Sequence, residues 1–157
     1  MLLALLLLIA CDESCPEISR LDGAWAVYAE TTTATVSGSN GGNFPWDDVF
    51  AEAWSEWDLR WVAGRGDFEL EVDGQPYTAA YTPDEVDCDA FTLSFDGRYL
   101  GEAGSTHDFT WTGALSHVGS HFDGTFAFED SWSDASSGQD GTLSIQDGTV
   151  TANTRSE

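Results

Sequence analysis

The sequence contains no lysine, and its five arginines stand against 28 aspartate and glutamate residues, so the formal net charge of its 157 residues is −23. A polyanion repels the phosphates of nucleic acids and the headgroups of anionic lipids. We therefore expect no nucleic-acid partner and no basic patch that would hold the chain on a membrane surface.

The short motifs typical of common catalytic and cofactor sites are also missing. The chain has no Gly-x-Ser-x-Gly turn, no His-Glu-x-x-His pair, no phosphate-binding glycine loop and no dinucleotide fingerprint. None of its three cysteines belongs to a Cys-x-x-Cys pair, which argues against a zinc site built on them. These absences predict that the protein is not an enzyme and has no cofactor and no bound metal.

Two metal sites were weighed against that expectation. His117 and His121 have a spacing that zinc sites use on helices, but Gly119 between them predicts a turn, so we expect His107, His117 and His121 to be surface residues. Acidic residues gather in two predicted loops, 84–89 and 129–134, and would suit structural calcium. Neither stretch matches an Asp-x-Asp-x-Asp-Gly loop, so we expect the acids to be solvated.

Long hydrophobic runs are absent except at the start, where residues 1–11 are apolar and end at Cys11. A helix needs about 20 apolar residues to cross a bilayer, so this run has the length of a signal-peptide core. The four residues Leu8-Ile9-Ala10-Cys11 resemble the lipobox of bacterial lipoproteins, although no basic residue precedes the run. The alternative is a buried element that begins the fold.

The lipobox resemblance implies that Cys11 is acylated and becomes the first residue of the mature chain. Residues 1–10 would then be a lipoprotein signal peptide, residues 11–22 a lipidated tether, and residues 23–157 a single domain. This organisation predicts a protein anchored to a membrane of the cell envelope, facing the periplasm or the cell surface.

The two cysteines that remain, Cys15 and Cys88, form an even pair. Exported proteins meet an oxidising environment in which such pairs form disulfides. We expect a Cys15–Cys88 bridge, with two free thiols as the alternative.

Most of the chain after Gly23 alternates between apolar and polar residues, as half-buried strands do. Asp-Gly pairs at 73–74, 96–97, 123–124, 140–141 and 147–148 are typical of tight hairpin turns. Together these signals predict an all-β fold, an antiparallel meander with one apolar and aromatic face. The inward rows are expected to include Trp57, Leu59 and Trp61; Phe68, Leu70 and Val72; Phe91, Leu93 and Phe95; Phe109, Trp111 and Leu115; Phe126 and Phe128; Leu143 and Ile145; and Val150 and Ala152.

One segment has a different period. Apolar residues recur at helical spacing after Pro45, which suits a first helical turn, and Asp47 and Asp48 suit a helix N-terminus. This pattern predicts one short helix near 45–56.

The beginning of the domain resembles the lipocalins and related calycin barrels. Gly23 and Trp25 match the Gly-x-Trp motif that opens those barrels, and Arg155 lies where such a barrel has an arginine that packs over this tryptophan. The resemblance implies an up-and-down barrel with an apolar cavity. A β-sandwich fits the same strands.

Seven tryptophans are the most unusual feature of the composition. Trp25, Trp57, Trp61 and Trp111 lie at inward positions, whereas Trp46, Trp54 and Trp132 lie in or near predicted loops, where an indole can stack on a ligand. We expect a non-enzymatic, lipid-anchored binding module for an apolar or amphipathic ligand. The alternatives are a carbohydrate- or protein-binding sandwich and a purely structural surface lipoprotein.

The lipid anchor is testable without a structure. Metabolic labelling with palmitate in the native host should mark the wild-type protein and not the Cys11→Ala variant, because only the cysteine thiol accepts the lipid. Equal labelling of both, or of neither, would contradict the anchor.

Overall fold

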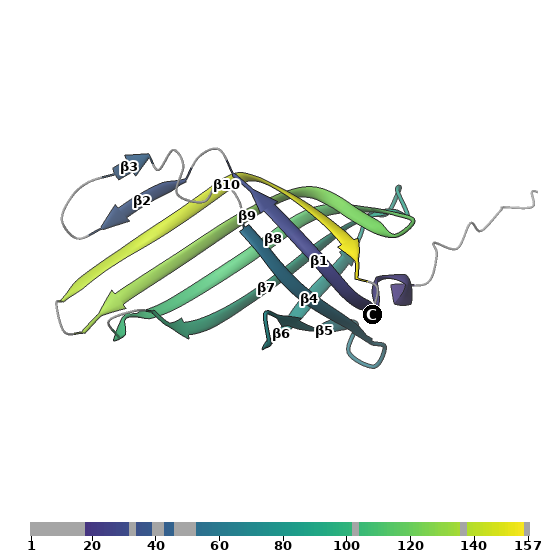
Figure 1. Cartoon of the computed structure of the whole chain (residues 1–157), viewed down its shortest axis with the longest axis horizontal. Coiled ribbons are helices and arrows are strands. Elements are labelled where there is room, and N and C mark those ends of the chain that lie inside the picture. The colour runs from purple at the N-terminus through teal and green to yellow at the C-terminus, as the bar shows by residue number, and fades with distance from the viewer. Residues whose placement is uncertain are drawn as a thin grey trace, which may run out of the picture.

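The computed structural model describes residues 18–31, 34–38, 43–45 (backbone only), 53–101, 104–135 and 138–155. Within these ranges the chain is almost entirely β-structure, with one short 3-10 helix at its start (Figure 1). In chain order the elements are η1 (Ile18–Leu21), β1 (Gly23–Glu30), β2 (Thr35–Gly38), β3 (Asn43–Pro45), β4 (Ala53–Val62), β5 (Asp67–Val72), β6 (Gln75–Pro83), β7 (Ala90–Leu100), β8 (Thr106–Val118), β9 (His121–Asp134) and β10 (Gln139–Thr154).

Strands β1 and β4 to β10 close into an eight-stranded antiparallel barrel. Each strand from β4 to β10 pairs with the next, and β1 pairs with both β4 and β10. Val27, for example, lies between Ser55 of β4 and Ala152 of β10. The predicted all-β, up-and-down fold is confirmed, and the closed pairing decides for the barrel against the sandwich.

Strands β2 and β3 extend the sheet beyond the closed barrel. In the 16-residue strand β10, residues 149–154 pair with β1, whereas residues 141–144 pair with β2. Strand β3 then adds to the outer edge of β2. Figure 1 shows β2 and β3 continuing the sheet beside β10, on the side away from β9, so the sheet extends past the closed barrel here.

The predicted helix near 45–56 is wrong where the structure describes it. Pro45 ends β3, residues 46–52 lie outside the described residues, and Ala53 begins β4. In β4, Trp54 is opposite Tyr28 and is 70% exposed, whereas Trp57 is 4% exposed and points inward. Residues three apart share a face in a helix but lie on opposite faces of a strand. Pairing with β1 and β5 establishes the strand.

The alternating pattern is confirmed strand by strand. The predicted inward positions supply most of the buried core, with Phe68 and Ala79 at 0% exposure. All four tryptophans predicted to be inward belong to the core or pack against it. The core residues that the structure buries most deeply are Trp25, Phe68, Phe122, Leu21, Leu70, Leu93, Val27 and Val150.

Of the five Asp-Gly pairs predicted as turns, only 73–74 forms one, between β5 and β6. The other four lie inside strands, and their glycines face inward. A Cβ on Gly97 would meet the rings of Tyr77 and Phe109 at 2.6–2.9 Å, and one on Gly148 would overlap the Phe126 ring. These two glycines are therefore required because a neighbouring ring approaches the backbone closely, and not because the chain turns there. Glycine inside a strand often marks such a close approach.

The end of the barrel where β1 begins is filled. Trp25 packs on Phe122 with ring centroids 4.9 Å apart, and its Nε1 donates a hydrogen bond to the Leu21 carbonyl at 3.0 Å. Leu21 is 2% exposed, so η1, which was predicted to lie in the tether, packs with the barrel. Among the residues that the structure describes, no helix is long and apolar enough to cross a membrane.

His117 lies at this closed end, and its burial predicts a pH dependence of stability. It is 5% exposed and its ring meets Trp25 edge-on. Burial lowers its pKa below the ordinary 6.5, and Arg20 and His121 lower it further, against a smaller opposing effect of Asp89.

Because the folded state disfavours the protonated imidazole, the unfolded chain takes up the proton first as the pH falls. The free energy of unfolding should therefore decline between about pH 7.5 and pH 5.5, as the pH passes the ordinary histidine pKa. His117→Leu should show a shallower decline in urea unfolding followed by tryptophan fluorescence. Equal slopes would show that His117 does not contribute.

Candidate functional site

A cavity of about 580 Å³ opens at the end of the barrel opposite Trp25. It lies where β1 and β9 end and where β8 and β10 begin, and most of its wall is aromatic or aliphatic. The lining residues are Ala29, Glu30, Thr31, Val36, Ala53, Tyr99, Ser105, His107, Trp111, Phe126, Phe128, Asp130, Trp132, Leu143 and Ile145. Its size is that of ordinary small-molecule sites, about 300–1,000 Å³.

A smaller space of about 190 Å³ lies deeper in the barrel, and Ala29, Trp111 and Phe128 line both. The interior of this half is therefore incompletely filled. Inward side chains shrink to Ala29 on β1 and Gly113 on β8, and the Trp111 ring lies over Gly113 along the wall. A ring held against the wall leaves the middle of the barrel open.

The cavity contains one buried acid, Asp130, which is 5% exposed. Its Oδ2 accepts a hydrogen bond from the Tyr99 hydroxyl at 3.0 Å and one from His107 Nδ1 at 2.8 Å. Its Oδ1 is buried and has no partner among the described residues. An ionised carboxylate only accepts hydrogen bonds, so the proton of this pair lies on His107 Nδ1.

The other nitrogen of the same ring faces a serine. His107 Nε2 lies 2.9 Å from Ser105 Oγ. In the neutral tautomer that carries its proton on Nδ1, Nε2 accepts a hydrogen bond from the Ser105 hydroxyl. Ser105, His107 and Asp130 thus form a hydrogen-bonded chain at the cavity wall.

Aromatic rings fix the orientation of His107. Tyr99 stacks on it with centroids 4.5 Å apart and planes 18° apart, and Trp132 stacks on it at 6.1 Å and 28°. Burial raises the pKa of Tyr99 to about 12, helped by the hydrogen bond to Asp130, so its hydroxyl stays protonated and keeps donating. The prediction that His107 and His117 are surface residues is wrong, because side chains from the barrel wall cover both.

The three tryptophans predicted to bind ligand have different positions. Trp132 lines the cavity. Trp54 lies outside the barrel, packed on Tyr28 with centroids 4.8 Å apart. Trp46 lies outside the described residues. The structure therefore brings one of the three to the cavity.

The residues predicted to close the barrel lie at its other end. Gly23 begins β1 with a φ of 131°, and Trp25 fills the end as described above. Arg155 follows β10; its backbone N–H donates to the Ala24 carbonyl, and its guanidinium pairs with Glu56 on β4.

Cys11 and Cys15 lie outside the described residues. Cys88 is half-buried in the turn between β6 and β7. Its carbonyl oxygen accepts a hydrogen bond from Arg20 Nη2 at 2.6 Å, and Arg20 Nη1 pairs with Asp89 at 2.7 Å. Arg20 thus holds η1 against the turn that contains Cys88.

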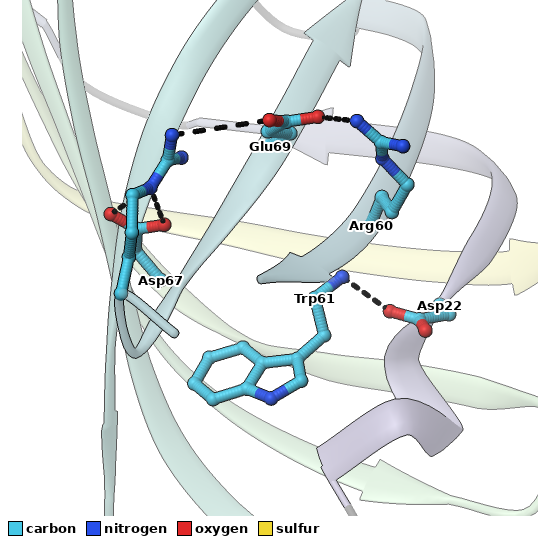
Figure 2. A network of polar contacts seen from close by, with 6 residues as sticks. Asp22, Arg60, Trp61, Asp67 and Glu69 are labelled. Carbon is cyan, nitrogen blue, oxygen red and sulfur yellow. Dashed lines mark hydrogen bonds and ion pairs between the residues drawn. The ribbon is translucent and has the colours of Figure 1, made fainter. Parts of the chain in front are cut away.

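The outer surface of β4 and β5 carries a shallow groove lined by charged residues. Figure 2 shows Glu69 beside Arg60, with which it pairs. Arg65 Nη1 also lies 3.9 Å from Glu69 Oε1. Arg65 also pairs with Asp67 at 2.9 Å, and Asp22 accepts a hydrogen bond from the Trp61 backbone at 2.6 Å. Arg60, Arg65 and Glu69 are therefore engaged in ion pairs with side chains of the barrel surface, and the groove also carries Asp58, Glu71 and Asp96.

The two acidic stretches considered for calcium are built differently. Residues 129–134 belong to β9 and are not a loop. In the turn at 84–89, Asp84 Oδ1 accepts from the backbone N–H groups of Val86 and Asp87, which lower its pKa. Within the described ranges no three His, Cys, Asp or Glu side chains gather as a metal site would require.

The chain was compared with known proteins. No protein-family model matches it, and no curated protein sequence does. The geometry of the cavity is therefore the basis for any functional inference.

Sequence reasoning missed Tyr99, Ser105, His107 and Asp130 as cavity residues. A signal was available, because Ser105 and His107 share the inward parity of Phe109 and Trp111, and Asp130 shares that of Phe126 and Phe128. A polar residue at an inward position is the exception that a buried site produces.

The role of Asp130 in holding this cluster can be measured. Asp130→Ala should lower the free energy of unfolding by about 1–3 kcal/mol, because it leaves the His107 and Tyr99 donors without their acceptor. Asp123→Ala, an exposed acid on the same strand, should change it by less than about 0.5 kcal/mol. Equal effects in chemical denaturation would contradict the role of Asp130.

Proposed function

We propose that the protein binds an apolar or amphipathic ligand in the cavity at the open end of the barrel. The observation that carries this proposal is an aromatic-lined cavity of about 580 Å³ with a small polar cluster on one wall. Apolar walls with a few placed polar groups are typical of small-molecule sites. A solid barrel core would have favoured a purely structural lipoprotein.

The net charge of −23 narrows the ligand further. Glu30 and Asp130 both line the cavity, and the barrel is a polyanion. A negatively charged headgroup would be repelled, so the ligand is a neutral or positively charged amphiphile rather than a fatty-acid anion.

We also propose that the barrel is anchored through a lipid on Cys11, in the cell envelope and facing the periplasm or the cell surface. The support is the sequence of residues 1–11. The tether joins the barrel at η1, which packs at the closed end, so the cavity would open away from the attachment point. In this arrangement the ligand reaches the cavity from the aqueous side.

A disulfide between Cys15 and Cys88 belongs to the same proposal. Its support is the contact of Arg20 with the Cys88 carbonyl and with Asp89, which holds the chain five residues after Cys15 beside Cys88. The bridge would fasten the tether to the barrel.

The binding of carbohydrate through exposed tryptophans is the weaker alternative. It needs indoles on a common outer surface, whereas Trp132 lines the cavity and Trp54 packs on Tyr28 outside the barrel. Binding of an apolar ligand and binding of carbohydrate can be distinguished with an apolar probe and with soluble oligosaccharides.

Binding is tested by quenching of tryptophan fluorescence with a brominated long-chain alcohol. Trp111 and Trp132 line the cavity, so the wild type should be quenched, and soluble oligosaccharides should change nothing. Ala29→Phe, which places a ring in the cavity, should weaken the binding at least about tenfold.

The matched control is Ala26→Phe, on the same strand and at an outward position. It should bind as the wild type does. Absence of quenching in the wild type, or equal quenching in all three proteins, would contradict binding in the cavity.

A further inference from the structure

The chain of Ser105, His107 and Asp130 has the connections of a catalytic triad. Ser105 Oγ lies 2.9 Å from His107 Nε2, and His107 Nδ1 lies 2.8 Å from Asp130 Oδ2. Both distances are in the range at which a base takes a proton from a nucleophile and an acid orients the base. The order serine, imidazole and carboxylate is the one that recurs on unrelated hydrolase folds.

The surroundings hold these groups in place. Asp130 is 5% exposed and the His107 side chain 17%, so the pair lies in a site from which much of the water is excluded. Tyr99 adds a second hydrogen bond to Asp130 and stacks on the imidazole. A base whose orientation is fixed by its neighbours needs little reorganisation during a reaction.

Gly101 packs directly against the Ser105 and His107 side chains, where a larger residue would not fit. A Cβ at this position would lie 2.5 Å from His107 Nε2 and 2.6 Å from Ser105 Oγ. The Gly101 backbone N–H donates to the Ser105 carbonyl at 2.8 Å, which fixes this turn against the start of β8. A glycine is therefore required at the point where the serine and the histidine meet.

We propose that this cluster hydrolyses a neutral carboxylic ester whose apolar chain occupies the cavity. The proposal rests on the function proposed above, because the chain must bind where Trp111, Phe126 and Phe128 line the wall. It departs from the sequence-based expectation of a non-enzymatic protein, which depended on the absence of linear motifs.

In the first half of the reaction, Ser105 Oγ forms a bond to the ester carbonyl carbon while His107 Nε2 takes the hydroxyl proton. The tetrahedral intermediate then expels the alkoxide, which receives that proton from His107 and leaves as the alcohol. Asp130 keeps the imidazole oriented and stabilises its positive charge. The product of this half is an acyl group on Ser105.

In the second half, water attacks the acyl carbon and gives a proton to His107. The Ser105–acyl bond breaks, and Ser105 Oγ recovers a proton from His107, so the sum is ester plus water to acid plus alcohol. The acid product ionises, and the net charge of −23 disfavours its retention. The cavity therefore binds the neutral ester more tightly than the anionic product.

The direct test is covalent labelling with a long-chain alkyl fluorophosphonate, followed by mass analysis of the peptides. The label should be on Ser105 in the wild type and in the Ser94→Ala control, whose serine is on the outer face of β7. It should be absent from Ser105→Ala and reduced at least about tenfold in rate in His107→Gln, which lacks the base.

Turnover is measured with p-nitrophenyl decanoate and p-nitrophenyl acetate. Wild type and Ser94→Ala should hydrolyse the decanoate faster than the acetate, and Ser105→Ala should lose at least about 100-fold of the decanoate rate. A preference for the decanoate would show that the apolar cavity binds the acyl chain. Loss of the decanoate rate in Ser105→Ala would show that Ser105 is the nucleophile.

The proposal is overturned if the phosphonate labels another residue or none, or if Ser105→Ala hydrolyses the decanoate as fast as the wild type. Quenching by the brominated alcohol separates the two proposals. If Ser105→Ala and wild type are both quenched and neither reacts, the cavity binds ligand and the triad is structural. If neither protein is quenched, the binding function itself fails.

Discussion

The barrel depends on one packing constraint, which is that large inward rings share the wall with inward glycines. Trp111 lies over Gly113, Phe126 covers Gly148, and Trp132 covers Gly141. A methyl group at any of these glycines would overlap the ring, so each aromatic is held along the sheet and does not cross the barrel. The constraint stabilises the wall and leaves an unfilled interior on the side where β8, β9 and β10 carry these pairs.

The two ends of the barrel differ because their inward residues differ. At the closed end, Trp25, Phe122 and Leu21 meet in the middle and exclude water. At the open end an ionised carboxylate is buried among rings, which costs free energy unless the charge is paired. The donors from Tyr99 and His107 offset that cost, but Oδ1 of Asp130 keeps no partner within the described residues. The cluster as a whole therefore adds little net stability, although removing one of its members leaves the others without partners and is costly.

The fold was predictable from the sequence because burial alternates with period two along the barrel strands, with one register shift in β10 between Ile145 and Gly148. What failed were the inferences that depended on short local patterns. Asp-Gly is typical of hairpin turns. At 96–97 and 147–148, however, the glycine is needed because an aromatic ring of a neighbouring strand fills the space of a side chain, and that ring is remote in sequence. The spacing of Trp54 and Trp57 is typical of a helix. The segment forms a strand instead, because β1 and β5 supply hydrogen-bond partners on its two sides. The wrong turns and the wrong helix have the same origin. In both cases contacts with a neighbouring strand determine the conformation, and these contacts cannot be read from the local sequence.

The candidate site was hidden for a related reason. Ser105 immediately precedes β8, His107 is on β8 and Asp130 is on β9, so no linear motif contains all three. Register alone brings them together: His107 is opposite Trp132, which places the imidazole diagonally across from Asp130 two residues away. Strand pairing is set by the alternating apolar rows, and the polar residues follow the register that those rows impose. The same hydrophobic pattern that closes the barrel therefore also aligns a nucleophile, a base and an acid at the wall of its cavity.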